Sequence, residues 1–159
     1  MLKFIIFSHI ITIIGLLVTI IFGHLTHFNI ENYKNTYLLY HIYIGFGLSL
    51  LGLLTHIFVI FYFIITGKGI KEKVIDQRKD DDIISETRKI KKKLFPYITL
   101  LLVLLPLMPI SGFAVVSGSW QLYLHIIVIY LGFFSYLFIT LKELYFLSKN
   151  IELIKQIKY

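Results

Sequence analysis

The chain has 159 residues, of which 57% are hydrophobic and 16% charged, and its formal net charge is +7. A soluble domain of this length could not keep so much apolar surface from water, because its own surface must still be covered by polar atoms. The chain has no cysteine, which excludes disulfides, thiolate metal sites, iron–sulfur clusters and covalent haem attachment.

Four apolar segments account for most of the length, and each is long enough to cross a bilayer, for which about 20 apolar residues suffice. They predict an all-α membrane protein, with four transmembrane helices in an up-down bundle forming one membrane domain over residues 1–159. The expected segments are spans at 4–27, 37–66, 94–116 and 120–147, a charged hairpin at 67–93, and a basic tail at 148–159 that lies on the membrane surface.

The positions of the charges argue against nucleic acid as a partner. Fifteen of the sixteen lysines and arginines fall on one side of the predicted membrane, and only Lys34 falls on the other. The positive-inside rule then places both termini and the hairpin in the cytoplasm. We expect an integral protein of the bacterial cytoplasmic (inner) membrane, with an organellar inner membrane as the alternative.

The first two spans carry most of the histidines. The first span is expected to be an uncleaved helix with His9 near its inner end and His24 and His27 near its outer end. Residues 37–66 of the second span have no charged side chain but contain His41 and His56. An ionisable side chain in hydrocarbon is costly and by default indicates a functional site.

The hairpin at 67–93 holds ten basic and six acidic residues. It is expected to be a solvated cytoplasmic segment that extends spans two and three as helices. The alternative is a docking surface for other subunits, because mixed charges suit protein contact better than phosphate binding.

The third span contains Pro106 and Pro109 in the motif PLMPISGF, so we expect a kinked helix in which Ser111 bonds a freed carbonyl. The fourth span is expected to start at Trp120 and carries His125. We expect no aspartate or glutamate to be embedded in the membrane, which argues against a proton pump or a carboxylate-type ion-coupled transporter.

Depth along the spans groups the histidines. His24, His41 and His125 each lie four or five residues from the outer boundary, which makes the outer level the stronger candidate site. His9 and His56 lie near the inner side with an expected mismatch of roughly 7 Å. For any single histidine the plainer interpretation is an interhelical hydrogen bond or an interfacial side chain, and His27 fits it best.

A b-type haem needs axial imidazoles, glycine where the porphyrin meets backbone, and polar groups for the propionates. Gly45 lies one turn from His41, Gly52 one turn from His56, and Gly132 two turns from His125. Candidate propionate partners near the outer face are Tyr33, Lys34, Tyr37, Tyr40, Ser119 and Gln121.

Four features of the chain resemble the bacterial cytochrome b-561 group. They are the four-span plan, a histidine early in spans one and four, the motif YHIYIGFG opening span two, and the motif PLMPISGF closing span three. They also resemble the related cytochrome b subunits of membrane hydrogenases and formate dehydrogenases, over roughly residues 4–147. The resemblance implies a respiratory-chain electron carrier linked to quinone, with one or two b haems, acting as a subunit of a redox complex rather than an enzyme on its own. It pairs His41 with His125 at the outer haem, and His9 with His56 at an inner one.

Two departures from that pattern keep other functions open. The family usually has a second histidine on span four, whereas this chain has Phe138, Ile139 and Thr140 there, and span two lacks the arginine often seen. One alternative is a metal-handling protein resembling the CopD copper-resistance family, in which the outer histidines receive a cation. The other is a structural membrane subunit without a cofactor.

Overall fold

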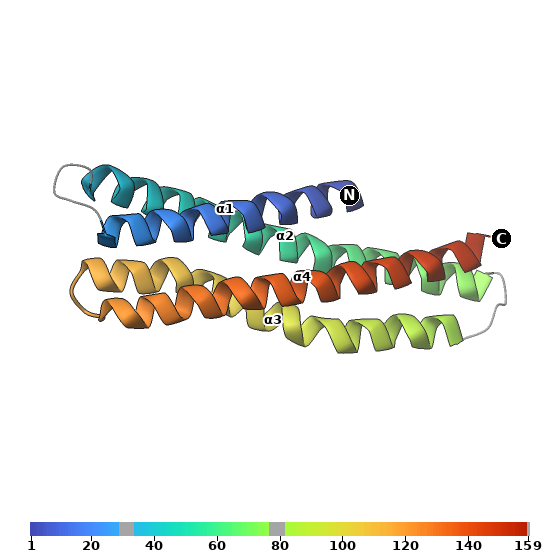
Figure 1. The fold of residues 1–159 in the computed structure, drawn as a ribbon. Coiled ribbons are helices and arrows are strands. Elements are labelled where there is room, and N and C mark those ends of the chain that lie inside the picture. The colour runs from blue at the N-terminus through green and yellow to red at the C-terminus, as the bar shows by residue number, and fades with distance from the viewer. Residues whose placement is uncertain (29–33, 77–81, 159) are drawn as a thin grey trace.

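The protein is described by a computed structural model that covers residues 1–28, 34–76 and 82–158. The described residues form four helices and no strand (Figure 1). The helices are α1 (Leu2–Phe28), α2 (Lys34–Asp76), α3 (Asp82–Val116) and α4 (Leu122–Lys158). All four are long and apolar enough to cross a membrane, as expected of an integral membrane protein.

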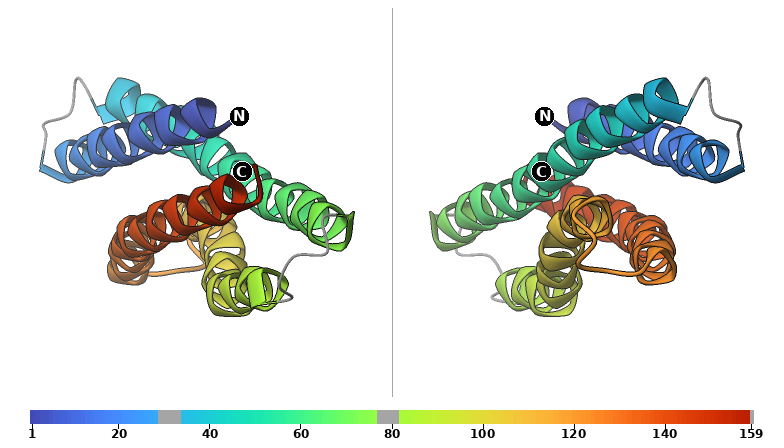
Figure 2. Two further views of the ribbon diagram at one scale, coloured as in Figure 1. Left: turned by 90° about the vertical axis from the view of Figure 1, so that its right-hand side faces the viewer. Right: turned by 90° about the vertical axis from the view of Figure 1, so that its left-hand side faces the viewer.

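Successive helices run up and down the bundle and pack against one another, and α2 also contacts α4 (Figures 1 and 2). The α3–α4 turn lies at one end of the bundle beside the last residues of α1 and the first residues of α2, and we call this the short-turn end. The last residues of α2 and α4 and the first residues of α3 lie at the opposite end, which we call the hairpin end. The N-terminus lies part of the way along the bundle, because α1 is the shortest of the four helices.

The polarity of the bundle is inverted relative to a water-soluble protein. Large apolar side chains point outward, as with Phe113 (74% exposed) and Tyr43 (71% exposed). Among the residues whose burial is described, the buried polar side chains are Ser8, His9, Thr12, Thr19, Ser49, Thr55, His56, Thr87, Ser111, His125, Thr140, Glu143 and Asn150. An apolar exterior around polar interhelical contacts is typical of helices that pack in lipid.

Several of these buried hydroxyls bond within their own helix. Thr12 donates to the Ser8 carbonyl at 2.8 Å and Thr55 to the Leu51 carbonyl at 2.8 Å. A hydroxyl that donates one turn back along its helix needs no water, so it can be buried at low cost.

The helices extend beyond the predicted spans at the hairpin end. Most of the predicted hairpin is helical, since α2 continues to Asp76 and α3 begins at Asp82; residues 77–81 lie outside the described part. The predicted tail at 148–159 is helical, because α4 continues unbroken to Lys158; its place on the membrane surface stays a prediction. The tail packs on α2 through a buried apolar cluster formed by Ile70, Val74 and Ile157.

Helix α3 contains three prolines, Pro96, Pro106 and Pro109, and remains one helix through all of them. Figure 1 shows that it bends as it crosses the bundle. The expected role of Ser111 is not seen, because its hydroxyl donates to the Met108 carbonyl at 2.8 Å. The carbonyls that Pro106 and Pro109 leave without a backbone donor are those four residues earlier, at Leu102 and Leu105.

The connection between α3 and α4 is short, and Gly118 adopts a φ of 75°, which residues other than glycine rarely adopt. Helix α4 begins at Leu122, two residues after the expected start at Trp120.

Val74→Asp should loosen the hairpin end, because Val74 is 1% exposed and an unpaired buried charge costs several kcal/mol. We expect faster proteolysis between residues 66 and 93 in the purified variant. The matched control is Ile75→Asp, since Ile75 is 63% exposed and a charge there stays outside the helix contact. Equal cleavage of the two variants would contradict the packing of α4 on α2.

Candidate functional site

Helix α4 presents one polar face to the interior of the bundle. Glu143 follows His125 by eighteen residues, which is about five whole turns, so the two side chains share that face. Tyr136 and Thr140 lie between them and are also buried. This face meets the histidines of α1 and α2 at two levels.

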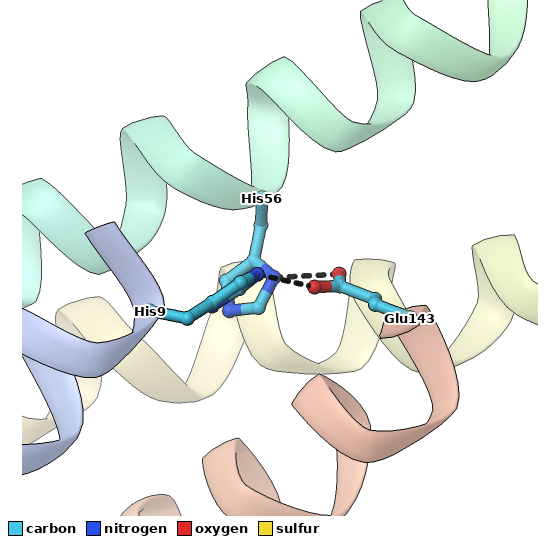
Figure 3. A group of neighbouring side chains, drawn as sticks. All are labelled: His9, His56 and Glu143. Atoms are coloured by element: carbon cyan, nitrogen blue, oxygen red, sulfur yellow. Dashed lines mark hydrogen bonds and ion pairs between the residues drawn. The ribbon is translucent and has the colours of Figure 1, made fainter. Parts of the chain in front are cut away.

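The first level is a cluster of His9 from α1, His56 from α2 and Glu143 from α4, which we call the His–Glu cluster (Figure 3). The His56 Nδ1 lies 2.7 Å from Glu143 Oε1, and the His9 Nε2 lies 2.9 Å from Glu143 Oε2. The two imidazole centroids are 5.2 Å apart. All three side chains are shielded from the surroundings, with exposures of 2% or less.

Helix α4 also orients the His9 ring. Its Nδ1 lies 2.9 Å from the Tyr136 hydroxyl and 3.4 Å from the Thr140 hydroxyl, so its Nε2 faces the carboxylate. The Tyr136 ring contacts both imidazoles, with centroids 5.8 Å from His9 and 5.0 Å from His56. Such outer contacts fix the direction in which an imidazole nitrogen is presented.

Two sequence-based expectations are wrong at this cluster. Glu143 is a buried carboxylate in the fourth apolar helix, where none was expected. The predicted 7 Å mismatch between His9 and His56 is absent, because α1 and α2 bring the two rings into contact. The five-turn spacing from His125 is the sequence signal that would have identified Glu143. The donor set here is therefore two imidazoles and a carboxylate, not two imidazoles alone.

The second level, nearer the short-turn end, is a pair formed by His41 of α2 and His125 of α4, which we call the His–His pair. Their centroids are 6.0 Å apart and their planes are nearly perpendicular, at 88°. His41 Nδ1 donates to the Thr19 carbonyl at 2.9 Å. His125 Nδ1 donates to the Ser111 hydroxyl at 2.8 Å, since that hydroxyl gives its own proton to Met108. Among the described residues, neither Nε2 has a hydrogen-bond partner.

Two glycines that the sequence analysis did not single out lie against this pair. A Cβ at Gly23 would lie 2.9 Å from His41 Cε1, and one at Gly112 would lie 3.1 Å from His125 Cε1. The motif PLMPISGF thus supplies both the hydroxyl and the glycine that hold the His125 ring. Because Gly23 and Gly112 have no side chain, each imidazole can lie directly on a neighbouring helix.

The three glycines expected near a porphyrin lie against protein side chains. A Cβ at Gly45 would lie 3.0 Å from Thr19, one at Gly52 3.1 Å from Tyr136, and one at Gly132 2.6 Å from the Met108 sulfur. These glycines allow close approach of side chains from neighbouring helices. Their contact with a porphyrin stays a prediction.

The remaining outer candidates are spread out. His24 is exposed, donates from Nδ1 to its own Ile20 carbonyl at 2.9 Å, and has its Nε2 3.4 Å from the Tyr130 hydroxyl. Tyr40 and Gln121 are exposed, and Ser119 lies 3.0 Å from Ser117. Outside the described part are Tyr33 and the side chains of His27, Lys34 and Tyr37.

Gly112→Val should lower the melting temperature of the purified protein by several degrees, because a side chain there displaces the His125 ring. Overpacking of this kind costs about 1–3 kcal/mol. The matched control is Gly47→Val, since a Cβ at Gly47 would meet nothing within 4 Å. A Gly112 variant as stable as the Gly47 variant would show that the imidazole does not lie on this glycine.

Comparison with known proteins adds no relative from which a function can be transferred. No protein-family model, no curated protein and no solved structure matches the chain. Any assignment of function therefore depends on the two histidine levels themselves.

Proposed function

We propose that the chain is a four-helix membrane cytochrome b, with one b-type haem held by His41 and His125. The observation that supports this most is the state of the two imidazoles. Each Nδ1 donates a hydrogen bond to a different neighbouring helix, and each Nε2 is left for a ligand bond.

This donor set fits haem iron. Neutral imidazoles donate to the metal through one ring nitrogen while the other is held by an acceptor, which fixes the tautomer and the ring direction. Two such residues from facing helices form the bis-histidine ligation of membrane cytochromes. When bound, haem b supplies one-electron redox chemistry; the chain's own residues position it and exclude water.

The proposed orientation of the chain in the membrane follows from the distribution of its charged residues. The basic residues gather at the hairpin end, so both termini and the hairpin belong in the cytoplasm, and the His–His pair lies toward the outer face. A bacterial inner membrane and a quinone as redox partner suit a cytochrome of this plan. The exposed Lys68–Glu72 and Glu86–Lys89 pairs at the hairpin end offer mixed charge for contact with another subunit of a redox complex.

Metal handling is the second candidate, and the His–Glu cluster favours it. The outer cation site expected for a CopD-like protein has less support, because both ring nitrogens of His24 make hydrogen bonds, to Ile20 and Tyr130. A structural subunit would need neither histidine level.

His41→Ala and His125→Ala should each remove the haem, because one axial imidazole and its held geometry are lost. The measurement is a reduced-minus-oxidised visible spectrum of the purified protein, with haem quantified as the pyridine haemochrome. His24→Ala is the matched control and should keep the haem, since His24 is exposed and bonds its own helix.

A flat spectrum from protein made with ample haem would overturn the cytochrome proposal. Full haem content in both the His41 and the His125 variant would overturn the ligand pair.

Single cysteines can test the orientation, because the natural chain has none. Ser119→Cys, in the exposed α3–α4 turn, should react with a membrane-impermeant thiol reagent in intact cells. Arg88→Cys, exposed near the hairpin end, should react only after the cells are opened. The reverse pattern would invert the proposed topology.

A further inference from the structure

We propose that the His–Glu cluster is a second, separate site that binds one divalent transition-metal ion through His9, His56 and Glu143. The three side chains come from α1, α2 and α4, and each offers a ligand atom within 4.8 Å of the others. This proposal does not depend on haem at the His–His pair.

The contact between His9 and Glu143 is the strongest indication of a bound cation. Nε2 and Oε2 are 2.9 Å apart, yet neither atom makes a hydrogen bond. If His9 donates from Nδ1 to Tyr136, its Nε2 directs a lone pair toward the carboxylate, and two electron-rich atoms touch. With the other tautomer, the N–H is not aligned with the oxygen well enough to form a hydrogen bond. A cation bonded to both atoms removes the repulsion in the first case, and neither tautomer otherwise satisfies the pair.

His56 supplies a further unsatisfied donor atom. Its Nδ1 is bonded to Glu143 Oε1 at 2.7 Å, whereas its Nε2 is buried without a hydrogen-bond partner. The side chain is 0% exposed. Each buried polar atom without a hydrogen-bond partner costs about 1–3 kcal/mol of stability. Three such atoms in one cluster therefore indicate that a partner is missing.

The buried charge of Glu143 also favours a bound metal ion. Glu143 is 0% exposed in an apolar helix, and among the described residues its ion-pair partners are His9 and His56 alone. An ionised carboxylate in such surroundings must be paired or must coordinate a metal. The two imidazoles supply positive charge only if they are protonated, whereas a divalent ion compensates the carboxylate directly.

The donor types select the class of metal. Two imidazoles and one carboxylate suit zinc and the neighbouring divalent ions from iron to nickel, while calcium and magnesium prefer oxygen ligands only. Copper(I) prefers sulfur ligands, which the cluster lacks. Three protein ligands leave a coordination position for a water or another small ligand.

The test uses the purified full chain, stripped with a chelator and titrated with cobalt(II) chloride as the probe. Bound cobalt is measured by elemental analysis and by its visible ligand-field absorption. The wild type should bind one cobalt per chain. Glu143→Gln should weaken binding by at least about 100-fold, since loss of even an outer-shell partner costs about 10–100-fold.

The matched control is Glu152→Gln, the same substitution on the same helix at an exposed position, and it should bind as the wild type does. Tyr136→Phe should weaken binding by about 10-fold, because it removes the hydroxyl that orients His9. This milder variant keeps the test decisive if Glu143→Gln fails to fold.

Two results would overturn the proposal. One is a wild type that binds no more cobalt than a folded Glu143→Gln variant, which would leave a proton as the occupant. The other is a haem that persists when His41 and His125 are both replaced by alanine and is lost on further replacement of His9. Failure of the cytochrome proposal would instead appear as a chain without haem that still binds cobalt.

Discussion

Glu143 is the constraint on which the arrangement of the bundle depends. A carboxylate in the middle of an apolar helix cannot face lipid, so α4 must turn it inward and other helices must compensate it. His9 and His56 contact it from α1 and α2, and this fixes the level at which three helices meet. Helix α3 contributes apolar side chains at the core, including Leu101 and Leu105, both fully buried.

The same helices then define a second level nearer the short-turn end. His41 precedes His56 on α2 by fifteen residues, or about 22 Å of helix. Here the imidazoles face each other without a carboxylate, and each is held by a neighbouring helix through Nδ1. One four-helix bundle thus presents two chemically different groups of side chains, an imidazole pair that we propose holds haem and a carboxylate-containing cluster that we propose holds a divalent metal ion.

Much of the fold was predictable, because long apolar segments have few alternatives to helices in a membrane. The four helices and the helical extensions around 67–93 agree with the sequence-based expectations. His9 and His56 were predicted as an inner pair, but the carboxylate beside them was not, although Glu143 falls within the predicted span at 120–147. The expected span limits also set His9 and His56 at different depths. Side-chain depth depends on how helices are offset along the bundle, and the tertiary packing of α1 on α2 decides the offset between His9 and His56. The roles of Gly23 and Gly112 likewise depend on interhelical contacts that no local motif encodes.

The most direct test of the whole account is the parallel determination of haem and total transition metal per chain in one purified sample. The account predicts one b-type haem, together with one further divalent metal ion that is not haem iron. Two haems per chain with no additional metal would contradict it, because both histidine levels would then hold the same cofactor. A sample with neither would leave both levels as packing contacts only.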